Sequence, residues 1–343
     1  MNSISVGEYW SILGDEDTTD EQILELSLID RSDGGFNVQL VPNPELVDVT
    51  EEDLAEESFR SIGNALFRWR RHRQFNRRRK DEPELPVLVS EGDSWFHFPL
   101  FISETIDQLG SEYLIWSVGE AGDTAANMLL SEQEKNKTEY LLALRKQKDL
   151  ARAFLLSAAG NDILGMDPET DESALFGLLR DFDPEMNDDP CKAIDEEQLH
   201  ERLAFLRSAY QSAISAIRNE PGFEQLPIVT PGYDYPFPFP WGDQDHRDPL
   251  WAKSDEWLGR PFADRNFPAT PFRRQVLTFM VDALYDVLND LAGESASTNV
   301  WVVDCRGAMP ELTDWADEIH GTSAGFAKVA QRFSTTLTQA IGD

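Results

Sequence analysis

Residues 85–95 read Leu-Pro-Val-Leu-Val-Ser-Glu-Gly-Asp-Ser-Trp, and this stretch points to the fold class. The uninterrupted apolar run Leu85–Val89 leads into a polar turn that contains Gly92, Asp93 and Ser94. Continuous rather than alternating hydrophobicity is typical of a strand that is buried on both faces of a parallel sheet. The stretch therefore predicts a central strand with a serine at its carboxyl end.

Four more apolar runs of this kind follow along the chain. Apolar runs lie at Tyr113–Val118, Ala153–Ala158, Leu226–Thr230 and Val300–Val303, and helical periodicity covers residues 100–109, 123–134, 138–149, 196–218, 273–292 and 323–340. Strands that alternate with helices predict an α/β fold, in which a parallel sheet has helices on both faces. Ligands of such sheets bind outside the carboxyl ends of the strands. We therefore expect the functional residues in the loops after these runs.

Three further loops contain residue types that acyl-transfer chemistry uses. Gly122 follows the second run, Asn161 follows the third, and Asp317 precedes His320 by three residues near the end of the chain. Acyl transfer needs a hydroxyl nucleophile, a base with a pKa near neutrality and an acid that orients the base. It also needs hydrogen-bond donors where negative charge develops on the carbonyl oxygen. The four loops together contain these groups.

Four sequence blocks, in this order, resemble those of the SGNH/GDSL hydrolase family: Gly92-Asp93-Ser94, Gly122 within Ala121-Gly122-Asp123-Thr124, Gly160-Asn161-Asp162, and Asp317-x-x-His320. The resemblance covers residues 85–343. It implies a flavodoxin-like, three-layer α/β/α fold with a parallel five-stranded sheet. It also implies that Ser94 is the nucleophile, that His320 is the general base and acid, and that Asp317 orients His320.

The resemblance further implies an oxyanion hole made of the backbone N–H groups of Ser94 and Gly122 and the side-chain amide of Asn161. The chain departs from the family pattern at two positions. Trp95 stands where leucine is common after the serine, and Ala121 stands where a serine is common before the glycine. The first departure concerns the floor of the pocket and not the nucleophile.

Two competing assignments of the catalytic residues are weaker. Gly321-Thr322-Ser323-Ala324-Gly325 fits the nucleophile-elbow pattern GxSxG, but that elbow lies between a strand and a helix with a histidine later in the chain. No histidine follows here, so we interpret Thr322 or Ser323 as the cap of the C-terminal helix. His97 is close enough to Ser94 in sequence to be a rival base, but no neighbouring acid could orient it. We expect His97 in the wall of the pocket.

A long segment rich in aromatic residues and proline, residues 233–272, lies between the fourth and fifth runs. Loops longer than about 12–15 residues are usually functional or disordered, and this many aromatic side chains pack down rather than stay solvated. We expect a lid-like wall that binds an acyl chain, an aromatic group or a sugar ring; the alternative is that the segment only covers a helix layer. The predicted substrate-binding residues are Trp95, His97, Tyr233, Tyr235 and Trp241. Residues 166–198 form a second, acidic insertion that we expect to be exposed.

Two parts of the chain are distinguished by their composition. Residues 1–80 are predicted as an N-terminal extension, and residues 81–343 as the hydrolase domain. Residues 51–79 predict a helix with a basic run, Arg68–Lys80, at its end. Lipid headgroups or an acidic partner could bind this run. We favour the interpretation that these arginines pair with acids of the same protein.

The charge of the chain limits its partners. Sixty-three acidic residues against 30 basic ones give a net charge of −33, which repels nucleic acid and anionic lipid. No stretch approaches the ~18 apolar residues of a membrane helix, and no secretory signal is visible, so a cytoplasmic location is expected. Cys191 and Cys305 form no metal or redox motif, and the expected chemistry needs no metal and no cofactor.

These observations predict an enzyme that cleaves carboxylic esters or thioesters through a covalent acyl-enzyme, such as a lipase, a lysophospholipase or a thioesterase. The expected substrate is a small-molecule or lipid ester. Alternatives are an acyltransferase or a deacetylase that acts on a sugar, and a non-catalytic effector or binding module in which residues 1–80 carry the function. The sequence leaves the acyl group, the alcohol and the oligomeric state open.

Overall fold

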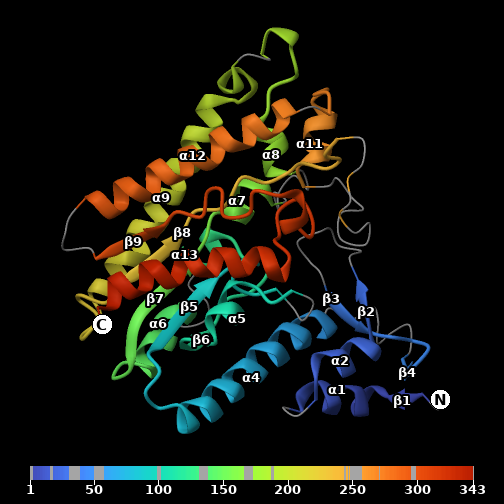
Figure 1. The fold of residues 1–343 in the computed structure, drawn as a ribbon, viewed down its shortest axis with the longest axis vertical. Helices are drawn as coiled ribbons and strands as arrows, with labels where there is room; N and C mark the ends of the chain where they lie inside the picture. Colours follow the sequence, from blue (N-terminus) through green and yellow to red (C-terminus); the bar gives the residue numbers. More distant parts are fainter. Residues whose placement is uncertain are drawn as a thin grey trace.

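The computed structural model describes residues 3–15, 18–30, 39–49, 58–98, 102–130, 138–165, 173–186, 189–242, 245, 247, 257–269, 271–294 and 299–342. At its centre lies a five-stranded parallel sheet (Figure 1). The strands lie in the order β6-β5-β7-β8-β9. Their bounds are β5 (Val87–Gly92), β6 (Leu114–Ser117), β7 (Ala151–Ser157), β8 (Ile228–Pro231) and β9 (Val300–Val303). This is the flavodoxin-like order, and it confirms the predicted fold class.

Both faces of the sheet are buried, because successive side chains of a strand point to opposite faces. In β5, Val87 and Val89 pack in one hydrophobic core, and Leu88 between them packs in the other. The first core is completed by α6 (Glu139–Lys146), α9 (Glu196–Arg218) and α12 (Pro271–Gly293). The second is completed by α5 (Thr105–Leu109) and α13 (Ser323–Ile341), which lie side by side in Figure 1. Burial on both sides explains why the strand sequences are continuously apolar.

Most helices follow the predicted ones with small shifts at their ends, but two segments differ. Of the predicted helix 100–109, α5 covers only Thr105–Leu109. Helix α9 begins and ends where the sequence pattern predicts, and the side chain of Asp195 caps its first turn. Within residues 123–134, the described part contains a π-helical turn, Ala126–Leu130, in place of the predicted regular helix. Such turns are rare and often lie at functional sites. This one follows closely on the loop that contains Gly122.

Short elements connect the layers of the fold. They are the helices α7 (Gly160–Leu164), α8 (Ala174–Leu178) and α11 (Gly259–Asp264), and the 3₁₀ turns Pro184–Met186, Pro190–Ala193 and Leu312–Asp314. Across the described ranges, no helix combines the length and the apolar character that crossing a membrane requires.

The N-terminal part of the chain has a small core of its own, formed by buried Tyr9, Leu13, Ile23 and Val47. Its elements are β1 (Ile4–Ser5), α1 (Val6–Gly14), α2 (Asp20–Glu25), β2 (Ser27–Asp30), β3 (Gln39–Pro42) and β4 (Val47–Asp48). Helix α4 (Ser58–Asp81) runs from this part to the sheet, where it contacts β6 (Figure 1). Arg70 of α4 donates hydrogen bonds to the carbonyl oxygens of Leu13 and Asp15, at 2.9 and 2.7 Å. Helix α4 therefore ties the N-terminal part to the edge of the sheet.

The expectation that residues 166–198 are exposed is wrong at two points of the described part of that insertion, whereas residues such as Asp181 and Glu185 are exposed. Leu175, Leu179 and Ile194 are buried in the core that contains α9 and α12. Leu179 and Ile194 also form an antiparallel bridge. The overall acidic composition of the insertion gave no sign of these apolar residues. They lie in two short groups, near Leu175–Leu179 and at Ile194, and they anchor the insertion to the core.

Candidate active site

The turn after β5 holds Ser94 through contacts of the preceding Asp93. The Asp93 carboxylate accepts hydrogen bonds from the Trp95 backbone N–H and the Ser157 hydroxyl, both at 3.1 Å, and from the Tyr233 hydroxyl. Burial raises the pKa of Asp93 to about 6, although these three donors favour its charged form. At Gly92 a Cβ atom would lie 2.9 Å from the Ser157 Cβ, so the turn packs tightly against β7.

Ser94, His320 and Asp317 lie in contact in series. The Oγ atom of Ser94 lies 2.8 Å from Nε2 of His320, and Nδ1 of His320 lies 2.8 Å from Oδ2 of Asp317. All three side chains are buried. When Nδ1 donates its proton to the carboxylate, Nε2 is left to accept the serine proton, which is the arrangement that acyl transfer requires.

The loop that carries Asp317 and His320 is held by its own backbone. The second carboxylate oxygen of Asp317 accepts the backbone N–H groups of Ile319 and His320, at 2.9 and 2.7 Å. The carbonyl oxygen of Ile319 in turn accepts a hydrogen bond from the indole N–H of Trp95, at 3.0 Å. The bond between Trp95 and Ile319 therefore joins this loop to the Ser94 turn, in addition to the contact between Ser94 and His320.

The GxSxG match at residues 321–325 is the start of a helix. Thr322 is the N-cap of α13, and its side chain accepts the Gly325 backbone N–H at 3.1 Å. The loop before it contains a 3₁₀ turn and a single bridge between Trp315 and Gly321 instead of a strand. The interpretation of Thr322 as a helix cap is confirmed.

The loops of Gly122 and Asn161 are tied together. The side-chain amide of Asn161 donates to the carbonyl oxygen of Asp123 at 2.7 Å, and the Ala125 N–H donates to the Asp162 carboxylate at 2.8 Å. Gly122 has a φ of 85°, which favours glycine. Within the described residues, the backbone N–H groups of Ser94 and Gly122 have no protein acceptor. Their role as oxyanion donors stays a prediction, and these unpaired N–H groups are compatible with it.

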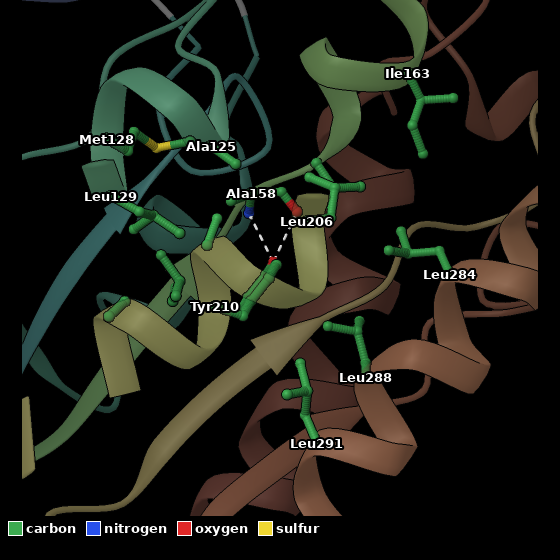
Figure 2. Packing of buried hydrophobic residues seen from close by; sticks show 14 of the residues in the cluster. Ala125, Met128, Leu129, Ala158, Ile163, Leu206, Tyr210, Leu284, Leu288 and Leu291 are labelled. Atoms are coloured by element: carbon green, nitrogen blue, oxygen red, sulfur yellow. Dashed lines mark hydrogen bonds between the residues drawn. The ribbon is translucent and has the colours of Figure 1, made fainter. Parts of the chain in front are cut away.

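Helix α9 supports the turn that leads to Asn161. The Tyr210 hydroxyl donates to the carbonyl oxygen of Ala158 at 2.7 Å and accepts the N–H of the same residue at 3.2 Å (Figure 2). The next residue, Ala159, has a φ of 111°, which is a strained conformation for a residue with a side chain. Strain of this kind persists where the surroundings fix the backbone, and Tyr210 supplies such a restraint.

Helix α4 contacts both the Ser94 turn and the Gly122 loop. Arg71 donates to the carbonyl oxygen of Phe96 at 3.1 Å and pairs with buried Glu104. Arg68 donates to the carbonyl oxygen of Val118 at 3.2 Å and pairs with Glu120 of the Gly122 loop and with Glu139 at the start of α6. The interpretation that arginines of the basic run pair with acids of the same protein is confirmed for these two.

The aromatic insertion is fastened to the His320 loop through Glu318. One oxygen of the buried Glu318 carboxylate accepts the N–H groups of Phe239 and Gly259, at 2.6 and 2.7 Å. The other accepts the N–H groups of Leu258 and Trp257, at 3.0 and 3.2 Å. Burial raises the pKa of Glu318 to about 7, against the effect of these donors. In the sequence, only the position of Glu318 beside Asp317 distinguishes it from the many other acidic residues.

A second contact from the insertion reaches Asp317 itself. Arg247, buried and paired with Asp245, donates to the carbonyl oxygens of Phe237 at 2.7 Å and Asp317 at 3.1 Å. The ring of Trp257 meets the His320 imidazole edge-on, with 5.3 Å between the ring centroids. The described part of the insertion therefore packs on the His320 loop, which supports the expectation that it forms a wall of the site.

An apolar cavity opens beside Ser94 and Asn161. The side chains on its far wall belong to α7 and α12, and they are Ile163, Leu164, Leu277, Met280, Val281 and Leu284. Its empty space, including the part open to solvent, is about 650 Å³. Small-molecule sites typically occupy 300–1,000 Å³.

Two of the five predicted substrate-binding residues, Trp95 and Tyr233, line this cavity. His97 lies instead against Arg71, and burial together with this arginine lowers its pKa well below the usual range. Tyr235 donates to Asp282 at 2.7 Å. Trp241 packs against Phe237, while Trp251 and His246 lie outside the described residues. The sequence could not separate Tyr233 from Tyr235 and Trp241, because the whole segment 233–272 is rich in aromatic residues.

No group of three or more His, Cys, Asp or Glu side chains within the described ranges is arranged to hold a metal ion. The cysteines Cys191 and Cys305 are both free thiols, and burial raises the pKa of Cys305.

Comparison with known proteins gives only distant structural likeness. No family model and no curated protein matches the chain. An extracellular lipase from Streptomyces rimosus is similar at 12% identity and a TM-score of 0.40, over 73% of this chain and 99% of the lipase. A catalytic mutant of an acetylxylan esterase from Geobacillus stearothermophilus is similar at 17% identity and a TM-score of 0.37, over 75% and 94%. A carbohydrate acetylesterase from Sinorhizobium meliloti is similar at 12% identity and a TM-score of 0.37, over 74% and 99%.

Proposed function

We propose that the chain is a serine hydrolase of the SGNH/GDSL type that cleaves carboxylic esters or thioesters. The observation that carries the proposal is the series of two contacts, each 2.8 Å long, from Ser94 Oγ through the His320 ring to the Asp317 carboxylate. These residues come from loops 226 positions apart in the sequence. A chance contact is not expected to place the Ser94 hydroxyl and the Asp317 carboxylate on the two different nitrogens of the His320 ring.

The reaction follows from this geometry in two halves. The Ser94 oxygen attacks the carbonyl carbon while His320 Nε2 takes its proton. The bond to the leaving oxygen or sulfur then breaks, and the leaving group takes that proton from the imidazolium. Water attacks the acyl-enzyme with His320 as base, and the bond between the acyl carbon and Ser94 breaks as the serine recovers its proton. Asp317 holds the ring and stabilises its charged form.

The negative charge of the tetrahedral intermediates falls on the carbonyl oxygen, and we assign its stabilisation to the N–H groups of Ser94 and Gly122 and to the second amide hydrogen of Asn161. Removing one such donor typically costs about 10²–10³ in kcat. Asn161→Ala should therefore retain labelling of Ser94 by reactive probes but hydrolyse esters much more slowly.

The alternative of a binding module with its function in residues 1–80 has less support, because Arg68 and Arg71 are engaged with the site loops and with internal acids. Transfer of the acyl group to an alcohol or a sugar uses the same residues. Adding an alcohol acceptor to the assay separates the two, since a transferase would divert product from acid to ester.

Labelling with a fluorophosphonate probe tests the assignment of Ser94. Wild type should be labelled and should hydrolyse simple esters, and Ser94→Ala should not be labelled and should lose about 10⁴–10⁶-fold in kcat. Ser90→Ala is a matched control on the strand that precedes Ser94, because the Ser90 hydroxyl is buried without a hydrogen-bond partner in the described structure. Absence of labelling in folded wild type would contradict an activated serine.

A further inference from the structure

The cavity beside Ser94 has polar residues in its wall, but their hydrogen-bonding atoms are already used. The carboxylate of Asp234 accepts three backbone N–H groups, from Tyr235, Gly307 and Met309, at 2.6–2.7 Å. The Asp93 carboxylate and the Tyr233 hydroxyl bond to each other. A substituent inside the cavity therefore finds apolar surface and few free polar partners, which disfavours a sugar or a charged group there.

The indole N–H groups of the two tryptophans in the wall, Trp95 and Trp315, also already have hydrogen-bond acceptors. The indole N–H of Trp95 donates to Ile319, and that of Trp315 donates to the carbonyl oxygen of Met309, both at 3.0 Å. In the described wall, the polar groups that remain for a substrate are the hydroxyl and backbone N–H of Ser94 and the amide of Asn161, all at the reacting end. The rest of the wall binds through apolar contact alone.

The position of the cavity distinguishes the two halves of an ester. Ser94 and Asn161 line it, and His320 does not. The leaving oxygen must reach Nε2 of His320 to be protonated, so the alcohol lies on the histidine side. The group that extends from the carbonyl carbon past Asn161 toward α7 and α12 is then the acyl group.

The cavity has room for a substituent beyond the carbonyl carbon. Its empty space, including the part open to solvent, is about 650 Å³. Figure 2 shows Ile163 on α7 and Leu284 on α12, two residues of the walls that enclose this volume.

Resting on the proposed serine hydrolase function, we propose that the enzyme prefers an uncharged aliphatic acyl chain, which enters the cavity between α7 and α12. Met280 and Val281 of α12 set the permitted length. The aromatic insertion contributes Tyr233 and the backbone around it to the wall. The main determinants of acyl length thus lie on a helix outside the insertion.

The test is the acyl-length profile of kcat/KM on nitrophenyl esters from acetate to decanoate. Wild type should show an optimum at an acyl chain longer than acetate, with a kcat/KM at least about tenfold higher than for acetate itself. Met280→Ala removes volume from the wall and should move the optimum to longer chains. Val281→Phe, at a half-buried position of the wall, should move it to acetate. Leu288→Ala is the matched control, since Leu288 is buried on α12 but does not line the cavity.

Fluorophosphonates with alkyl chains of graded length separate this proposal from the one on which it rests. The rate of Ser94 labelling should show the same length preference and the same shifts as the esters. If folded wild type reacts with none of them, the serine hydrolase assignment fails. If all proteins are labelled but Met280→Ala and Val281→Phe keep the wild-type profile, the acyl pocket is wrong and the hydrolase assignment stands.

Discussion

Tyr233 joins the Ser94 turn to the Asn161 turn. Its hydroxyl donates to the Asp93 carboxylate and accepts the Gly160 backbone N–H at 2.8 Å. A single phenol thus bridges two of the loops that the proposed reaction needs, from a position 140 residues beyond Asp93.

Replacement of Tyr233 by phenylalanine should loosen both turns. Tyr233→Phe leaves a buried carboxylate and a buried N–H each short of one partner, so we expect a loss of about 1–3 kcal/mol in the free energy of unfolding. We also expect kcat to fall by about tenfold or more, because the nucleophile and the Asn161 donor are no longer fixed relative to each other. Tyr235→Phe is the control, since its hydroxyl bonds only to the partly buried Asp282. Equal effects of the two variants on kcat would contradict the bridging role.

Removal of the Glu318 carboxylate should release the insertion from the His320 loop. Glu318→Ala leaves four backbone N–H groups without their acceptor, so we expect a loss of about 3 kcal/mol or more in the free energy of unfolding. Chemical denaturation measures this loss, and Glu201→Ala on the exposed surface of α9 is the control. A Glu318→Ala protein as stable as wild type would show that the insertion is held by other contacts.

The free energy of unfolding should fall as pH rises from about 4.5 to about 7. In the folded protein, burial raises the pKa of Asp93 to about 6 and that of Glu318 to about 7. In the unfolded chain both ionise near pH 4. Between these limits the folded state binds more protons, so stability is greatest at the acidic end and is lost as pH rises through the folded pKa values.

A non-titrating variant isolates the contribution of Glu318 to this slope. The net charge of −33 also lowers stability as more carboxylates ionise, in the same direction. Glu318→Gln cannot titrate, so its stability should fall less than that of wild type over this range, by about 3 kcal/mol for a shift of this size. Parallel curves for the two proteins would show that Glu318 does not titrate in this window.

Arg71 should matter more than other arginines of α4. Arg71→Ala removes the partner of buried Glu104 and the donor to Phe96, so we expect a loss of about 3–5 kcal/mol in the free energy of unfolding. Because Phe96 lies two residues after Ser94, kcat should also fall at temperatures where the variant is folded. Arg79→Ala is the control, since Arg79 is exposed on the same helix and its loss should cost less than about 1 kcal/mol. Similar losses for both variants would contradict a specific role of Arg71.

The sequence by itself determined the strands, their alternation with helices and the turns that end them. Each of these depends on local patterns: an apolar run such as Leu85–Val89 forms a buried strand, and a cap such as Asp195 starts a helix. The parallel arrangement then places the turns at one edge of the sheet, which is why Ser94, Asn161 and His320 could be grouped in advance. Where composition alone was used, as for the acidic insertion, the prediction was wrong because apolar anchors lay among the acids.

Only the tertiary structure decided which side chains support the site. Tyr233 was predicted to bind substrate and also bridges two loops. Glu318 had no distinguishing pattern, and α12 contributes four side chains to the cavity wall. Such contacts join residues far apart in the sequence, and they follow from how the layers pack rather than from any period along one element. A local sequence pattern determines which face of a helix or strand a residue lies on. Which distant residue it contacts is determined only by the folding of the whole chain.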